Sequence, residues 1–290
     1  MNEPEAVRRI LLDAAERYLR NPDRTSEVKG VRDLVTETDR MLGSFLAEQL
    51  PTVRSDALVT GEDLPPATGP SATGPAVTGD TEPPRWRWRL DPVDGTVNFA
   101  RGLPWYSVCV TLEQDERTRL AVVLDVERGR LITATAGGGT VRHAADPTHP
   151  TDAGGPGEPI RVVRREVSAS LVSVMLTPKM SLGARAATLR LIDHLLEHTQ
   201  GVRILVSQAL EAVLLAQGQL DAVVTLESSG GWTRSASMLF ASEAGGRVTE
   251  LHDTTGGRSG FLLSADEDFA HWLGSWCAGH GITPVARLKG

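Results

Sequence analysis

The sequence predicts a mixed fold, α+β in its first half and α/β in its second half, and two patterns along the chain support this. Near the N-terminus two helical stretches precede a run of β-rich segments, which is typical of helices that cover an antiparallel sheet. Further along, β-rich and helical stretches alternate, which favours an α/β layer. We therefore expect two domains, residues 1–157 and 158–290, with the boundary near the end of a Pro/Gly-rich stretch.

The first half opens with two predicted helices. In residues 3–21, EPEAVRRILLDAAERYLRN, apolar side chains recur every three or four residues with charged side chains opposite them. The second helix follows Thr36, which has Asp39 three residues later in the pattern of an N-terminal capping box. We expect Pro51 to end this helix, because a proline disfavours helical backbone in the residue before it.

β-rich segments fill the rest of the first half. A short strand in residues 56–63, DALVTGED, is followed by residues 64–85, which contain almost no large apolar side chain. Such a segment has little surface to bury, so we expect a flexible loop and predict that residues 65–84 are mobile without ligand. Consecutive antiparallel strands are predicted within residues 86–90, 105–114 and 120–139.

The second half follows a polar, Pro/Gly-rich stretch, residues 143–159. Its β-rich segments and helical segments alternate without a break, as expected for a sheet covered by helices. In chain order we expect a strand in 169–177, a helix in 184–198, a strand in 202–206, a helix in 208–219, a strand in 220–226, a helix in 234–246 and a strand in 247–251.

Composition excludes several classes of protein. A formal net charge of -7 argues against general affinity for nucleic acid or for anionic membranes. No stretch is apolar enough to span a bilayer or to form a signal peptide. Cys109 and Cys277 have no metal-type spacing and are expected to be small buried side chains in a reducing compartment. We therefore expect a cytoplasmic protein with no membrane or nucleic-acid partner.

The stretch RWRLDPVDGTVNF, residues 87–99, places Asp91 and Asp94 three residues apart, directly before Gly95 and Thr96. One interpretation is mechanical, with a proline-stiffened turn and a capped helix after a strand. The other is chemical: two carboxylates and a carbonyl bind a divalent cation, and the amide groups behind them face an anion. Taken alone, this stretch leaves both interpretations open.

Three stretches resemble the signatures of the inositol monophosphatase family of magnesium-dependent, lithium-sensitive phosphatases. They are GED at 61–63, WRLDPVDGTVNF at 88–99 and GGWTRSASMLFASEAGG at 230–246, with supporting stretches at 29–39, 120–139 and 202–223. The resemblance extends over nearly the whole chain and implies a layered α-β-α-β-α sandwich, assembled as a homodimer. It also implies that residues 1–157 bind metal and phosphate, and that residues 158–290 complete the substrate pocket.

Metal ligands follow from the resemblance by position. Asp91 would bridge two ions, Asp94 would bind the second, and the carbonyl of Val93 would bind the first. Asp63 takes the place of a glutamate that is usual in the family and would be a shorter metal ligand. The implied cofactor is Mg²⁺, with Mn²⁺ as the alternative, because oxygen ligands suit both ions.

The catalytic and phosphate-binding residues also follow from the resemblance. Thr96 and Asp39 would orient the attacking water, and the amide groups of Gly95 and Thr96 would hold phosphate oxygens at a helix start. The implied activity is hydrolysis of a small polyol, sugar or nucleotide-like phosphate, by two-metal activation of water.

Departures from the family pattern gather in the expected substrate pocket, and Thr233 stands where the family has a metal-binding aspartate. They disfavour myo-inositol phosphate as the substrate and leave an alternative, a phosphatase fold with altered or lost catalysis. Such a protein would bind a phosphorylated ligand without turnover, or eliminate or cyclise it. The predicted pocket residues are Glu62, Ser207, Gln208, Thr233 and Arg234.

His194 and His198 stand four apart on a predicted helix, a spacing that two zinc ligands can share. The same helix carries an apolar stripe, and the sequence offers no obvious third ligand nearby. We interpret the pair as surface histidines.

Overall fold

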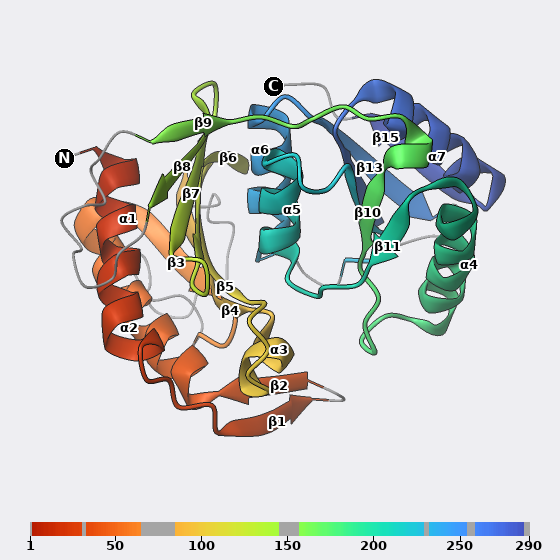
Figure 1. Cartoon of the computed structure of the whole chain (residues 1–290). Coiled ribbons are helices and arrows are strands. Elements are labelled where there is room, and N and C mark those ends of the chain that lie inside the picture. The colour runs from red at the N-terminus through yellow and green to blue at the C-terminus, as the bar shows by residue number, and fades with distance from the viewer. Residues whose placement is uncertain are drawn as a thin grey trace, which may run out of the picture. The chain divides into compact units, whose positions relative to one another are not determined.

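A computed structural model describes residues 2–30, 33–64, 85–144, 157–228, 232–253 and 259–286, and it confirms the mixed fold class (Figure 1). The chain divides into two compact units, Met1–Pro159 and Ile160–Gly290, here termed unit 1 and unit 2. The segment predicted to be mobile, residues 65–84, lies outside the described residues, as do residues 145–156 of the expected linker.

Unit 1 is built on a sheet of seven strands among its described residues. β3 and β4 pair in parallel, and β4 to β8 pair antiparallel with their sequence neighbours, which confirms the predicted run of antiparallel strands. In sheet order the strands are β3 (Ala57–Gly61), β4 (Trp86–Asp94), β5 (Ser107–Gln114), β6 (Arg117–Asp125), β7 (Arg130–Thr135), β8 (Gly139–Ala144) and β9 (Glu158–Ile160).

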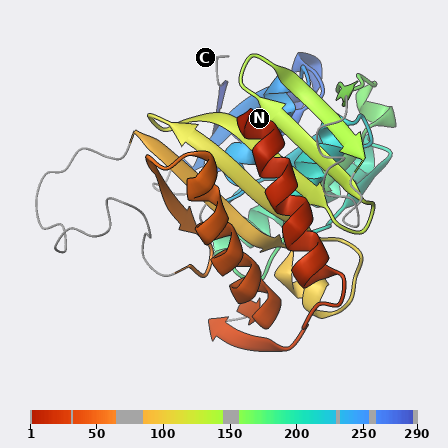
Figure 2. The ribbon, with the colours of Figure 1, turned by 90° about the vertical axis from the view of Figure 1, so that its left-hand side faces the viewer.

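Two helices lie across one face of this sheet (Figure 2). α1 (Glu3–Ala14) continues into a π-helical turn (Ala15–Leu19), and α2 (Glu37–Val53) packs beside it and against β4. Pro51 lies inside α2 rather than at its end, which corrects the predicted boundary. A proline this close to the C-terminus removes one hydrogen bond, and the helix ends only where Arg54 becomes extended. Fully buried leucines from both helices join the core of the sheet: Leu11, Leu12, Leu42, Leu46 and Leu50.

A two-stranded hairpin lies between α1 and α2 in the chain and contacts the segment that follows β4. β1 (Ser26–Gly30) and β2 (Asp33–Thr36) pair antiparallel, and β2 leads directly into α2. The sequence did not reveal the hairpin, because every residue of β1 is exposed and no apolar alternation marks it. At its end Thr36 caps α2, and the predicted capping box with Asp39 is confirmed. The short helix α3 (Thr96–Ala100) packs on β2, so the start of α2 meets the residues that follow β4.

Unit 2 is built on a mixed sheet of six strands among its described residues. β10 pairs in parallel with β11 and β12, whereas β14 is antiparallel to both of its neighbours. The strand expected at 202–206 ends at Arg203, because Val206 has a φ of 57°, which no strand residue adopts. The strand order is β11 (Gly201–Arg203), β10 (Leu171–Val174), β12 (Ala222–Thr225), β14 (Ser259–Ser264), β13 (Arg247–Asp253) and β15 (Ile282–Ala286).

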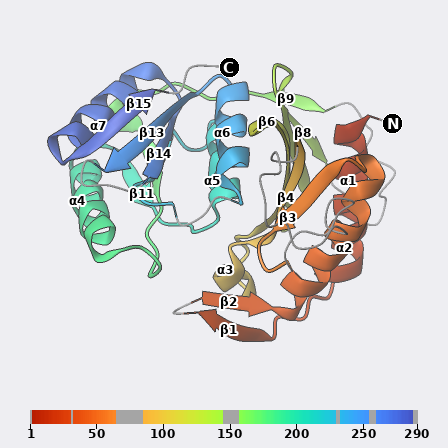
Figure 3. The ribbon, with the colours of Figure 1, turned by 180° about the vertical axis from the view of Figure 1, so that it is seen from behind.

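Helices cover both faces of this second sheet, as Figures 1 and 3 show. α5 (Gln208–Ala216) and α6 (Arg234–Glu243) pack together on one face. α4 (Leu182–His198) and α7 (Glu267–Gly279) lie on the other and share a core with β10, β12 and β14. The predicted alternation is confirmed as far as β13, and β14, α7 and β15 follow the last strand expected from the sequence.

Candidate active site

A break in the pairing of β4 with β5 shapes the centre of the site in unit 1. Asp91 lies opposite Cys109, pairing then becomes irregular, and it resumes with Asp94 opposite Ser107. Residues three apart on a regular strand point to opposite faces, so the irregularity allows the two aspartates to approach each other. Both are buried, and Ser107 Oγ lies 3.3 Å from Asp94 Oδ2 and donates to it.

Thr96 and Asp39 lie next to each other although they are far apart in sequence. Thr96 Oγ1 is 3.4 Å from Asp39 Oδ1 and 2.9 Å from the carbonyl oxygen of Val93. The other carboxylate oxygen of Asp39 accepts hydrogen bonds from the amide and the hydroxyl of Thr36 in the capping box. One oxygen of Asp39 therefore serves the helix, and the other faces Thr96.

Negative charge is concentrated around Asp91. Burial raises the pKa of its carboxyl group well above the usual range, and the charges of Glu62, Asp94 and Asp39 raise it further. Burial also raises the pKa of Asp39, although the hydrogen bonds from Thr36 oppose this. Buried like charges cost free energy unless a cation neutralises them.

Lys29 is a residue of this site that sequence reasoning missed. Its ammonium group lies 2.8 Å from Glu62 Oε1 and 2.6 Å from Asp63 Oδ2. Burial lowers the pKa of Lys29, but the hydrogen bonds that it donates to Asp63 and Glu62, together with their charges, outweigh burial and raise the pKa overall. The contact joins β1 to the end of β3 across more than thirty residues of sequence, a separation over which no local pattern operates.

The acids gathered here are of a kind that suits a hard divalent cation such as Mg²⁺, although among the described residues no three of them bring ligand oxygens within 4.8 Å of one another, so an ion would have to draw them together. Carboxylate oxygens are the ligands that this ion prefers, and the acids that raise the pKa of Asp91 outweigh the opposing effect of Lys29. Asp63 is held by Lys29, so an ion bound at Asp63 competes with that ammonium group. The clustered acids of unit 1 are Asp39, Glu62, Asp63, Asp91 and Asp94.

Gly95 forms the turn behind the two aspartates. Its φ of 97° lies in the left-handed region, where glycine is unstrained, and α3 starts at the next residue. The first amide groups of a helix have no partner within the helix, so Gly95 and Thr96 stand where an anion is favoured.

In unit 2, two of the predicted pocket residues contact each other. Gln208, at the start of α5, donates from Nε2 to Thr233 Oγ1 at 3.1 Å. Thr233 is buried and precedes α6, and Ser207 is fully buried before α5. Two departures from the family pattern are thus one hydrogen-bonded pair, a link that spacing in the sequence could not show.

Arg234 faces β13 and β14. Its guanidinium group donates to Ser259 Oγ at 3.1 Å and to the carbonyl oxygen of Gly260 at 3.4 Å, and it lies 3.6 Å from Glu250 Oε2. Glu227, which lies near an acidic position of the family pattern, accepts hydrogen bonds from the amide and hydroxyl of Ser181 at the start of α4. Glu227 therefore supports a helix start.

The inositol monophosphatase family matches residues 4–274, and the chain therefore belongs to this family. An inositol-1-monophosphatase from Mycobacterium leprae is 34% identical over 242 residues, which cover 82% of this chain and 74% of that protein. A Nus factor SuhB from Xylella fastidiosa is 30% identical over 194 residues, which cover 64% of this chain and 65% of that protein.

A solved structure of Mycobacterium tuberculosis SuhB has the same fold, with a TM-score of 0.68 at 22% identity, and the match covers 95% of this chain and 93% of that one. These similarities confirm the family resemblance and the fold expected from it. Family membership supports a metal-dependent phosphatase, an enzyme that hydrolyses phosphoric monoesters. Within the described residues, no helix has the length and apolar character needed to cross a bilayer.

The excess charge at Asp91 predicts a stability change. In metal-free protein at pH 8, Asp91→Asn should raise the free energy of unfolding by about 1–3 kcal/mol, because the amide removes a buried charge that faces other carboxylates. Because the folded-state pKa is raised above the unfolded value, the cost is complete above the folded-state pKa, declines as the pH falls below it, and vanishes below the unfolded value, where the group is protonated in both states. Urea unfolding in chelator should therefore show a gain that shrinks as the pH falls towards 4.

The matched control is Asp56→Asn. Asp56 directly precedes β3, at the end of this strand that lies away from Glu62 and Asp63, and its side chain is 63% exposed. It should change the free energy of unfolding by no more than about 0.5 kcal/mol. A loss of stability in Asp91→Asn at pH 8 would contradict the charge argument.

The left-handed backbone at Val206 predicts a second stability change. A β-branched residue is strained at a φ of 57°, even though its amide donates to Glu211 Oε1 at 3.0 Å. Val206→Gly should raise the free energy of unfolding by about 0.5–1 kcal/mol, since relief of strain exceeds the entropy that glycine adds to the unfolded chain. Val206→Ala keeps a Cβ atom and should gain less. Equal gains in the two variants would argue against backbone strain.

Proposed function

We propose that this chain is a divalent-cation-dependent phosphomonoesterase that acts on a small polyol, sugar or nucleotide-like phosphate. The observation that carries this proposal is the gathering of buried carboxylates around Asp91, directly beside the Thr96 and Asp39 pair. A purely structural role would not require Asp39, Asp91 and Asp94 to be buried close together, because buried like charges cost free energy.

Four groups are proposed to hold Mg²⁺, with Mn²⁺ as the alternative: the carboxylates of Asp63, Asp91 and Asp94 and the carbonyl of Val93. When bound, such ions polarise the phosphate group and neutralise charge on the leaving oxygen. Asp91 is proposed to be the most consequential of the four, because the family resemblance implies that its carboxylate bridges both ions.

Thr96 and Asp39 are proposed to orient the attacking water. When Thr96 donates its single proton to Asp39 Oδ1, its oxygen accepts a hydrogen bond from a water molecule. The raised pKa of Asp39 makes its carboxylate a better proton acceptor near neutral pH. The amide groups of Gly95 and Thr96 would hold phosphate oxygens of the substrate.

Unit 2, together with Glu62, is proposed to complete the substrate pocket through Ser207, Gln208, Thr233 and Arg234. The neutral Gln208 and Thr233 pair favours a substrate that offers hydroxyl groups rather than charge at this point. Homodimer formation remains a prediction from the family resemblance, and a cytoplasmic location remains a prediction from the composition of the chain.

A second candidate is a phosphatase fold with altered or lost catalysis, which binds a phosphorylated ligand or converts it by elimination or cyclisation. Thr233 favours this candidate, because a neutral hydroxyl already bound by Gln208 is a weak ligand for Mg²⁺. The name of one relative, Nus factor SuhB, also refers to something other than hydrolysis.

Phosphate release from a panel of sugar, polyol and nucleotide monophosphates tests the leading proposal. Release should need Mg²⁺ or Mn²⁺, stop in excess chelator, and fall by about a thousandfold or more in Asp91→Asn, as for loss of a principal electrostatic group. Asp56→Asn should keep full activity. Turnover in chelator, or in Asp91→Asn at the wild-type rate, would exclude the metal mechanism. Tight binding of a phosphate ester without turnover would favour the second candidate.

Thr233→Asp tests whether the second metal position has been weakened. Gln208 can donate to the new carboxylate, and Arg234 is engaged by Glu250, so we expect about tenfold tighter Mg²⁺ binding, equivalent to roughly 1.4 kcal/mol, and faster hydrolysis of simple phosphomonoesters.

Thr233→Asn, which has the same shape without the charge, should leave Mg²⁺ affinity unchanged. Calorimetric titration and phosphate release measure both variants. Slower hydrolysis in Thr233→Asp with unchanged metal affinity would show instead that the pocket is specialised around a neutral residue.

A further inference from the structure

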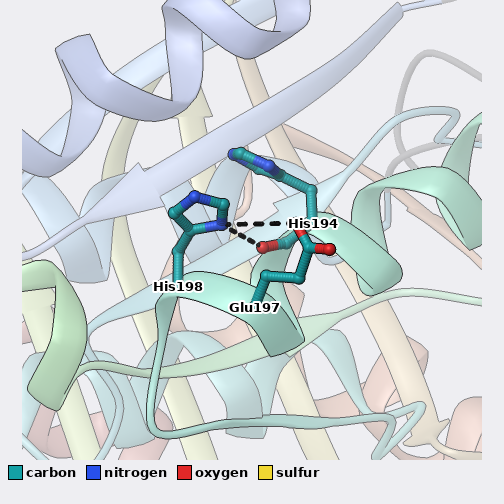
Figure 4. Close-up of side chains that lie close together, drawn as sticks. All are labelled: His194, Glu197 and His198. Atoms are coloured by element: carbon teal, nitrogen blue, oxygen red, sulfur yellow. Dashed lines mark hydrogen bonds and ion pairs between the residues drawn. The ribbon is translucent and has the colours of Figure 1, made fainter.

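Three potential metal ligands meet in the last turn of α4, in unit 2 and outside the proposed phosphatase residues. His194, Glu197 and His198 each offer one ligand atom, and these atoms lie within 4.8 Å of one another (Figure 4). Zinc bonds of about 2.0–2.2 Å place the ligands of one ion about 3–4 Å apart, so small side-chain rotations close the set. Glu197, the third ligand that the sequence analysis lacked, lies between the two histidines in sequence.

His198 is held in a form suited to metal binding. Its Nδ1 lies 2.8 Å from the backbone carbonyl oxygen of His194, an acceptor, so Nδ1 carries the proton and donates. The lone pair of the neutral ring is then on Nε2. Metal-binding histidines characteristically donate their other ring N–H in this way, which fixes the tautomer and the orientation of the ring.

His194 is positioned by aromatic side chains of α7. Its ring stacks on Trp272 at 5.2 Å and on Trp276 at 5.8 Å between centroids, and lies 4.4 Å from the ring of His198. The stacking limits the rotamers of His194, which reduces the entropy lost on binding.

Glu197 supplies the remaining ligand and negative charge. Its Oε2 lies 4.0 Å from His198 Nδ1, the ring nitrogen that donates, so the carboxylate must turn to share an ion with Nε2, and its side chain, which is 68% exposed, is free to do so. All three residues precede Thr199, the C-cap of α4. A cation at this end of a helix is also favoured by the helix dipole.

We propose that His194, Glu197 and His198 form a Zn²⁺ site at the C-terminal end of α4, with water completing the coordination. Two imidazole nitrogens and one carboxylate oxygen are a ligand set that zinc uses with an open fourth position. Mg²⁺ is not expected to bind there, because it prefers oxygen ligands. The site is independent of the proposed phosphatase activity and uses none of its residues.

Calorimetric titration of Zn²⁺ into the full chain, with Mg²⁺ in excess, tests the proposal. We expect saturable binding at one ion per chain that is weakened about tenfold or more in His194→Gln and in His198→Gln. As a second readout, Cu²⁺ should quench the fluorescence of Trp272 and Trp276 with the same dependence on the two histidines, because both tryptophans lie beside His194.

Two variants serve as matched controls. His271→Gln removes an exposed histidine of α7 that is outside the ligand set, and Asp91→Asn alters the proposed phosphatase metal site. Both should keep wild-type Zn²⁺ affinity at α4. Equal Zn²⁺ affinity in wild type, His194→Gln and His198→Gln would overturn the proposal, as would the absence of saturable binding. Circular dichroism that matches wild type shows that each variant is folded.

Discussion

The interrupted ladder between β4 and β5 is the constraint on which the rest of unit 1 depends. The interruption allows the side chains of Asp91 and Asp94 to lie close together. The chain then turns at Gly95, so that α3 begins directly after the two aspartates. α3 then rests on the hairpin that leads into α2, and this contact sets Thr96 beside Asp39. A local irregularity in one strand thus helps to place acids that come from two separate stretches of the chain, Asp91 and Asp94 in one and Asp39 in the other.

Stability and chemistry oppose each other in this arrangement. The core of α1, α2 and the sheet is well filled by buried leucines, whereas the acids at its edge carry charge that burial disfavours. Lys29 offsets part of that charge at Glu62 and Asp63, and a divalent ion would offset the part around Asp91. The free energy gained by burying the apolar core therefore compensates for the acidic cluster, which by itself destabilises the fold.

The sequence predicted the features that local patterns encode. The spacing of Thr36 and Asp39 predicts the capping box, and the alternation of β-rich and helical segments predicts the layers of unit 2. Contacts made across long separations left no such trace. Neither the pairing of Lys29 with Glu62 nor the bond between Gln208 and Thr233 has a fixed spacing, so both needed the folded chain. The exposed β1 strand was not predicted for a related reason: it has no buried face, so its sequence shows no alternation of apolar and polar residues.

Asp39 illustrates a constraint on how this chain can evolve. Its two carboxylate oxygens have different partners: one accepts hydrogen bonds in the cap of α2, and the other faces the hydroxyl group of Thr96. An asparagine would still accept from the Thr36 amide, so folding would tolerate the exchange while proton transfer would not. If Asp39 acts as proposed, a single nucleotide change, from an aspartate to an asparagine codon, would separate the proposed hydrolase from a stable ligand-binding descendant. Loss of catalysis would then leave the fold unchanged.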